Sequence, residues 1–207
     1  KGLMEGTKSA VFMPENYPPE QFYDNIIHTM SGYSTDKTNS NFIGEALYKQ
    51  MYERIKDLFY FVYIKPPEND HLTILKEFSD LITNKGVENI IIDPLMKVER
   101  PREFIVADDK YANYVTTLYT DFCRQYDIYL HLVMHQVTPR KAEGSQNYPK
   151  PNKYTAKGGG SWVEGCDNFI TIWRPEFGSS HTDTTVMFSS QKIKRPKLVG
   201  ITGDMMM

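Results

Sequence analysis

The sequence predicts an α/β fold: a three-layer sandwich with a largely parallel central sheet and antiparallel strands near the C-terminus. Short apolar runs alternate with segments of helical periodicity through most of the chain, as expected where helices connect parallel strands. The last strand-like runs follow one another without long helical segments between them, which favours hairpin pairing there. The length of 207 residues is enough for one sizeable core.

The segments expected to form strands are rich in apolar, aromatic and β-branched residues. They are Ser9–Met13, Leu58–Ile64, Glu88–Asp93, Ile128–Met134, Asn168–Trp173, Thr184–Ser190 and Leu198–Thr202. The three consecutive isoleucines of the third segment suit a strand that is buried on both faces.

Helices are expected between the early strands, where apolar residues recur every three or four positions. The first runs from near Glu20 to Gly32, the second from Phe42 to Ile55, and the third from Leu72 to Thr83, with Gly86 close to its end. A fourth helix should turn four side chains inward, namely Tyr111, Val115, Leu118 and Phe122.

Composition is that of an ordinary globular domain, with 40% hydrophobic and 24% charged residues and a formal net charge of -2. The two cysteines, Cys123 and Cys166, have neither zinc-site nor secretory spacing, so we expect a reduced, cytoplasmic setting. No apolar run is long enough to cross a membrane. The chain starts without an initiator methionine, and we expect it to be cut from a longer protein.

Three predicted strands end in a polar residue, at Glu15, Asp93 and His135. Ligands of open α/β sheets bind outside the carboxyl ends of the strands. Asp93 could hold Mg²⁺ against nucleotide phosphates, since Mg²⁺ prefers oxygen ligands. The alternative is that Asp93 caps a turn before Pro94.

Glu15 and His135 each have a functional and a structural interpretation. Glu15 could orient a water molecule or accept its proton, or it could be a surface residue in a turn. His135 could bind a terminal phosphate and respond to its loss, or it could be a histidine at the boundary of the sheet. We interpret the remaining histidines as structural: His28, His71, His131 and His181.

Two segments concentrate positive charge. Residues 136–160 show no periodicity and contain five cations and one glutamate, so we expect a functional loop that is mobile without a ligand. Its cations are Arg140, Lys141, Lys150, Lys153 and Lys157. The second cluster is Lys192, Lys194, Arg195 and Lys197, which could stabilise phosphate charge or form a solvated surface.

A nucleotide site built by this chain alone would lack one expected part. The sequence contains no Gly-x-x-x-x-Gly-Lys-Ser/Thr phosphate loop. The glycine run Gly158–Gly160 lacks that spacing and is interpreted as a turn.

Taken together, five segments resemble, in order, the RecA-like ATPase core of superfamily 4 replicative helicases, the DnaB and Twinkle type, and most closely phage primase–helicases. The matching segments are Ala10–Phe22, Ile90–Leu95, Leu132–Lys141, Gly160–Arg174 and Lys192–Lys194. The resemblance spans nearly the whole chain. It implies a single RecA-like domain over residues 1–207, truncated before residue 1, with the phosphate loop upstream.

The resemblance also assigns roles to residues. Glu15 falls on the catalytic glutamate, Asp93 on the Mg²⁺-linked aspartate and His135 on the γ-phosphate sensor. Lys192, together with Lys194 or Arg195, falls on the pair of cations that reaches a neighbouring subunit's nucleotide. ATP and Mg²⁺ are the implied cofactors.

The implied assembly is a homohexamer that hydrolyses ATP and translocates on single-stranded DNA, with primase as a candidate partner, in the cytoplasm of a bacterium or of a phage's host. The loop cations would contact the DNA backbone, and Tyr148 and Tyr154 could stack on bases. Two alternatives stay open: an inactive RecA-like module that binds DNA or a partner, and a recombination ATPase of the same fold.

Overall fold

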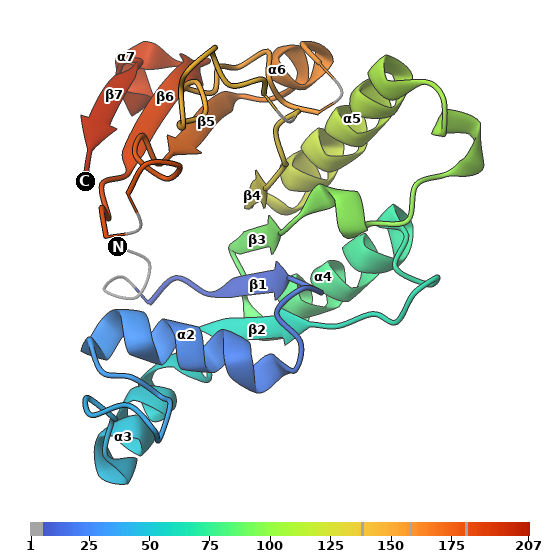
Figure 1. The fold of residues 1–207 in the computed structure, drawn as a ribbon. Helices are drawn as coiled ribbons and strands as arrows, with labels where there is room; N and C mark the ends of the chain where they lie inside the picture. The colour runs from blue at the N-terminus through green and yellow to red at the C-terminus, as the bar shows by residue number, and fades with distance from the viewer. Residues whose placement is uncertain (1–5, 138, 158, 181) are drawn as a thin grey trace. The chain divides into compact units, whose positions relative to one another are not determined.

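The computed structural model describes residues 6–137, 139–157, 159–180 and 182–207 (Figure 1). The chain divides into two compact units. The first comprises Lys1–Arg100 and Phe122–Val133, and the second comprises Pro101–Asp121 and Met134–Met207. Among the described residues, none of the helices has both the length and the apolar character that a membrane crossing requires.

The first unit is built on a four-stranded parallel sheet with the strand order β2-β1-β3-β4. These strands are β1 (Ser9–Phe12), β2 (Phe59–Val62), β3 (Asn89–Ile92) and β4 (Tyr129–Leu132). The two inner strands carry most of the core: every residue of β1 is buried, and Ile90 and Ile92 of β3 have no exposed surface. Ile91 is partly exposed, so the isoleucine run is buried mainly as predicted.

Three helices connect the strands of the first unit. They are α2 (Pro19–Ser31), α3 (Glu45–Ile55) and α4 (His71–Lys85). Helix α2 ends at Gly32 and α4 ends at Gly86, both in the left-handed conformation that glycine adopts without strain. The side chain of Asp70 accepts hydrogen bonds from the first turn of α4 and caps it. The sequence therefore predicted these helices to within a few residues.

The long helix α5 (Asp108–Tyr126) precedes β4, and its residues up to Asp121 belong to the second unit. Its buried residues are Tyr111, Ala112, Val115 and Tyr119. The prediction was correct for Tyr111 and Val115. Leu118 and Phe122 are only partly buried, because the buried stripe continues four residues beyond Val115, to Tyr119, and not three.

The second unit contains a three-stranded antiparallel sheet with the order β5-β6-β7. Its strands are β5 (Asn168–Trp173), β6 (Met187–Ile193) and β7 (Gly203–Met206). Antiparallel pairing near the C-terminus is confirmed, and among the described residues these strands form a sheet of their own. The short helix α6 (Ser161–Gly165) precedes β5, and its Trp162 packs edge-on against Tyr111 of α5, with ring centroids 6.1 Å apart.

Two predicted strand boundaries in the second unit were wrong. The strand expected at Thr184–Ser190 lies at Met187–Ile193, because pairing with β5 carries it through a polar stretch. The segment Leu198–Thr202 is not a strand. Pro196 starts the helical turn α7 (Pro196–Val199), and Leu198 is 79% exposed. Proline suits the first position of a helix, and the last strand therefore forms later, at β7.

Candidate nucleotide site and flanking cations

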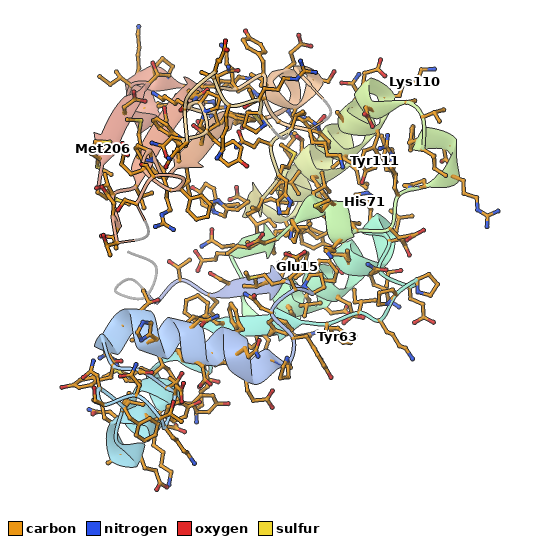
Figure 2. The ribbon with its side chains drawn as sticks, viewed as in Figure 1. Glu15, Tyr63, His71, Lys110, Tyr111 and Met206 are labelled. Atoms are coloured by element: carbon orange, nitrogen blue, oxygen red, sulfur yellow. The ribbon has the colours of Figure 1, made fainter. Side chains whose placement is uncertain are left out.

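Two candidate carboxylates follow neighbouring strands of the parallel sheet. Strands β1 and β3 are paired with Phe12 opposite Ile92, and the amide of Asp93 donates to the carbonyl of Phe12 at 2.9 Å. Asp93 therefore follows β3 directly, and Glu15 follows β1 after a tight turn in which the amide of Asn16 donates to the carbonyl of Met13. Figure 2 shows Glu15 just beyond the carboxyl end of β1. The strand order thus places both residues at one edge of the sheet.

Asp93 lies where the backbone is well fixed. The amide of Leu95 donates to the carbonyl of Val133 at 2.9 Å, which fastens the turn after Asp93 to the end of β4. The Asp93 side chain is partly buried. Among the described residues, no cluster of three or more His, Cys, Asp or Glu side chains could enclose a metal ion. A single carboxylate at a sheet edge fits Mg²⁺, which keeps several waters and shares its remaining ligands with phosphates.

Glu15 forms an ion pair that the sequence did not suggest. The Nζ of Lys97 lies 3.1 Å from Oε1 of Glu15, and the two side chains are 48% and 46% exposed. Lys97 is the last residue of the 3₁₀ turn η1 (Leu95–Lys97), four residues after Asp93. That spacing was the available signal, because one helical turn after a strand returns the chain to the same edge.

His135 comes three residues after the end of β4, in the second unit, and its side chain is exposed. Its carbonyl accepts a hydrogen bond from the amide of Lys157, and Gln136 bridges Ala156. The two ends of the predicted loop are therefore paired with each other in antiparallel fashion, directly after His135.

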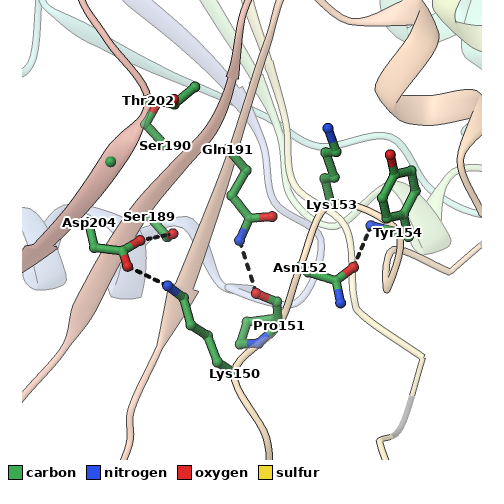
Figure 3. A pocket seen from close by; sticks show the side chains of 11 residues that line it. Lys150, Pro151, Asn152, Lys153, Tyr154, Ser189, Ser190, Gln191, Thr202 and Asp204 are labelled. Atoms are coloured by element: carbon green, nitrogen blue, oxygen red, sulfur yellow. Dashed lines mark hydrogen bonds and ion pairs between the residues drawn. The ribbon is translucent and has the colours of Figure 1, made fainter.

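Polar contacts hold the middle of the loop against the second sheet, in which it lines an open pocket with β6 and β7 (Figure 3). The Nζ of Lys150 lies 2.5 Å from Asp204 of β7, and the amide of Gln191 donates to the carbonyl of Pro151 at 2.9 Å. Ser189 also donates to Asp204. Hydrogen bonds from Lys150 and Ser189 lower the pKa of Asp204, which therefore stays ionised at neutral pH.

A second polar anchor involves Asn147. Its side-chain amide donates to Glu176 and Ser179, and it accepts from the amide of Gly178. The sequence had suggested that this loop has nothing to anchor it, because it carries no apolar periodicity. The anchoring of this part of the loop is polar, and that is why a search for apolar periodicity missed it.

The remaining loop cations differ in their surroundings. Lys141 lies over the ring of Tyr148 at 4.6 Å, and Lys153 lies over Tyr154 at 5.2 Å. Tyr154 is 65% exposed and Tyr148 is 37% exposed, so each tyrosine presents some of its surface to solvent next to a cation. The side chains of Arg140 and Lys157 are exposed, as a backbone contact would require.

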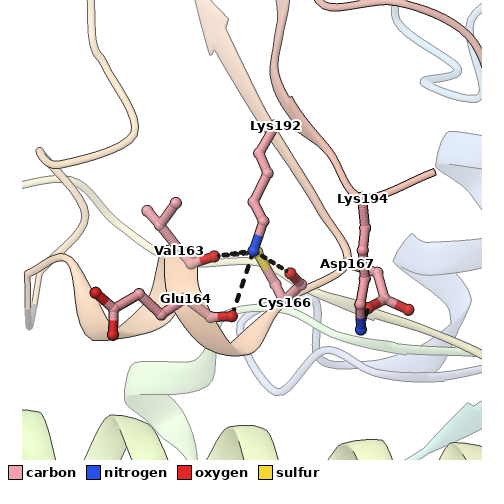
Figure 4. Close-up of polar contacts among 6 residues, drawn as sticks. All are labelled: Val163, Glu164, Cys166, Asp167, Lys192 and Lys194. Atoms are coloured by element: carbon pink, nitrogen blue, oxygen red, sulfur yellow. Dashed lines mark hydrogen bonds and ion pairs between the residues drawn. The ribbon is translucent and has the colours of Figure 1, made fainter. Parts of the chain in front are cut away.

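The lysines of the C-terminal cluster are bound within the second unit (Figure 4). The Nζ of Lys192 donates to three main-chain carbonyls at the end of α6, those of Val163, Glu164 and Cys166, the last at 2.7 Å. A cation at this position satisfies carbonyls that a helix end leaves without partners. Burial raises the pKa of the Cys166 thiol, and the charge of Lys192 opposes that effect.

Lys194 and Arg195 are both exposed but differ in their contacts. Lys194 pairs with Asp167 at 2.5 Å. The Arg195 side chain forms no hydrogen bond or ion pair with the described part of the chain, while its carbonyl accepts the amides of Leu198 and Val199. Arg195 is therefore the cation of this cluster that is able to reach another molecule without first breaking an ion pair.

Two solved structures share this fold over 98% of the chain. One is the ATPase domain of a DnaB-like helicase, with a TM-score of 0.75 and 14% identity, and the chain covers 71% of it. The other is a DnaB-like replicative helicase, described with its interactions with primase, with a TM-score of 0.75 and 14% identity, and the chain covers 48% of it. No protein-family model matches the sequence. No curated protein matches it either. The chain thus has the RecA-like fold of DnaB-like helicase ATPase domains.

Proposed function

We propose that this chain is the greater part of the ATPase core of a replicative DNA helicase, in which ATP hydrolysis drives translocation along single-stranded DNA. The observation that carries the proposal is the placement of Glu15 and Asp93 after adjacent parallel strands, at one sheet edge. In folds of this kind that edge is where nucleotides bind. The fold shared with helicase ATPase domains supports the same function.

Each proposed residue has a distinct task at that edge. Asp93 would hold Mg²⁺ through water, and the ion, when bound, would neutralise charge on the transferred phosphate. Glu15 would accept a proton from the attacking water. His135 would donate a hydrogen bond to the terminal phosphate and lose that bond on hydrolysis, which couples the loop behind it to the nucleotide state.

The free edge of β4 supports a further part of the proposal, that the phosphate loop belongs to a segment of the parent protein outside these 207 residues. Within the described residues, β4 pairs with β3 alone. Its Tyr129 is 72% exposed, whereas the inner strands β1 and β3 are largely buried. A parallel strand added to that edge would cover Tyr129. The loop after that strand would then emerge at the carboxyl edge of the sheet, on the side of β4 away from β3.

We further propose that the parent protein acts as a homohexamer in the cytoplasm, with primase as a partner. Arg195 is the preferred candidate for the cation that acts on a neighbour's nucleotide, since Lys192 and Lys194 are bound within their own unit. A trans-acting cation of this kind stabilises charge that develops in the transition state.

Single-stranded DNA would bind the loop through Arg140, Lys141, Lys153 and Lys157, with Lys150 available only after it leaves Asp204. Tyr148 and Tyr154 would offer ring faces to bases beside the cations of Lys141 and Lys153. Stacking on aromatic rings and contacts to the backbone are the two contributions that bind single strands without sequence preference.

The test is ATP turnover by the parent protein with and without single-stranded DNA. Glu15→Gln should lower kcat by about 10²-fold or more while ATP binding persists, because an amide keeps the shape of the side chain but accepts no proton. Glu20→Gln, an exposed glutamate in the first turn of α2, is the matched control and should turn over normally. Wild-type turnover in Glu15→Gln would remove Glu15 from catalysis. A wild-type parent without turnover that still binds DNA would favour the inactive module, for which the absence of a phosphate loop from this sequence speaks.

A further inference from the structure

The ion pair between Lys97 and Glu15 joins two turns that are far apart in the sequence. Lys97 follows β3 and Glu15 follows β1, and their charged atoms are 3.1 Å apart. Both side chains are about half exposed, and an exposed ion pair contributes little to stability. The position of this pair, beside the candidate catalytic carboxylate, points to a role other than holding the fold together.

The backbone of Lys97 is fixed from the side opposite Glu15. Asn69 is only 4% exposed, and its side-chain amide donates to the carbonyl of Lys97 at 2.5 Å. The carbonyl of Asn69 accepts the amide of Glu99, and the next residue, Asp70, caps α4. The amide of Lys97 also closes the 3₁₀ turn onto the carbonyl of Pro94. The lysine side chain therefore extends to Glu15 from a rigid base.

Glu15 needs such a partner for an electrostatic reason. A general base in ATP hydrolysis is an anion that must stay close to the water beside a highly charged triphosphate. Asp93 adds another carboxylate at the same sheet edge. Repulsion from these charges favours positions of the Glu15 side chain away from the reacting water, and three rotatable bonds allow it to move. A cation 3.1 Å from Glu15 offsets that repulsion and restricts the side chain.

We propose that Lys97 is the positioning residue for Glu15: it holds the carboxylate at the nucleotide edge in the orientation that hydrolysis requires. The proposal rests on the proposed function, because it presupposes that Glu15 is the general base. It assigns Lys97 no contact with the reacting atoms.

The test compares steady-state ATP hydrolysis by the full-length parent protein carrying Lys97→Met, Lys97→Gln or Lys97→Arg. Loss of the cation should lower kcat by about tenfold while KM for ATP changes by less than about twofold, because a misplaced catalytic group affects turnover and not nucleotide binding. Lys97→Arg keeps the charge and should recover most of the turnover. Lys49→Met, which removes an exposed ion pair with Glu45 on α3, is the matched control and should behave as wild type.

Three outcomes would overturn the proposal: an unchanged kcat in Lys97→Met and Lys97→Gln, a raised kcat, or a loss of turnover matched by an equal rise in KM. Glu15→Gln separates this failure from failure of the proposed function. If Glu15→Gln is inactive while Lys97→Met turns over normally, only the role of Lys97 is lost. If Glu15→Gln turns over normally, the proposed function itself fails. In the double variant, Lys97→Met should cause no further loss beyond that of Glu15→Gln.

Discussion

His71, the first residue of α4, should make the protein less stable in mild acid. Only 1% of its surface is exposed. Burial lowers the pKa of His71 from 6.5 to about 4, and the nearby Asp70 carboxylate only partly opposes this effect. The folded protein therefore keeps the ring neutral at pH values at which the unfolded chain has already taken up a proton.

The sign and size of the effect follow from proton linkage. Between pH 6.5 and about pH 4 the unfolded state binds more protons at His71 than the folded state does, so the free energy of unfolding falls as the pH falls through this range. At about 1.4 kcal/mol for each pH unit, this range corresponds to at most about 3 kcal/mol. The contribution is fully present above pH 6.5 and is lost by about pH 4.

Urea unfolding of the wild type and of His71→Gln, repeated at several values from about pH 7.5 down to about pH 4, measures this term. The wild-type free energy should fall by about 3 kcal/mol more than that of the variant over this range. His28→Gln, at an exposed histidine, should follow the wild type. Burial also lowers the pKa of His131, but that contribution is common to all three proteins and cancels. Parallel curves for wild type and His71→Gln would refute the reasoning.

Two further predictions concern the second unit. Gly165→Ala should lower the free energy of unfolding by about 1–3 kcal/mol, because an added Cβ would lie 2.4–2.6 Å from the side chain of Thr116, which is held by its own hydrogen bond to Ala112. Gly44→Ala, where a Cβ meets nothing within 4 Å, is the control, and equal stabilities would contradict the prediction. In single-stranded DNA binding by the parent protein, Arg140→Ala should reduce the log–log salt slope by about one. Lys150→Ala should reduce it by less, because Asp204 already neutralises that cation, and the reverse order would contradict the loop assignment.

Most of the first unit was predictable because its signals are local. The stops at Gly32 and Gly86 follow from the conformational freedom of glycine after a helix. The isoleucine run of β3 needs no knowledge of its neighbours to indicate a buried strand, since apolar β-branched residues favour that environment wherever the strand pairs. Glu15 and Asp93 were identifiable for the same reason: each is the polar residue that follows such a strand.

The C-terminal strands were less predictable because pairing, and not intrinsic preference, defines them. Strand β7 consists of Gly-Asp-Met-Met, a sequence with little tendency to form a strand, and it exists through its register with β6. The apolar residues Leu198 and Ile201 suggested a strand and are instead 79% and 85% exposed. Pro196 and Gly200 flank this stretch and favour a turn, so the local chemistry that decides the conformation lies at its ends.

The partners of the charged residues depend on strand order, which the sequence does not reveal. Strand β1 pairs with β3, although β2 lies between them in the chain. This arrangement brings the turn after β1 next to the turn after β3, and a lysine 82 positions away reaches Glu15. With β2 in the place of β3, Glu15 would instead face the segment around Tyr63. A charged stretch after a strand can therefore be recognised from the sequence as a candidate, but the carboxylate it serves is fixed only by which strands are neighbours. For this reason the catalytic roles of Glu15 and Asp93 could be proposed from motifs, whereas a role for Lys97 required the fold.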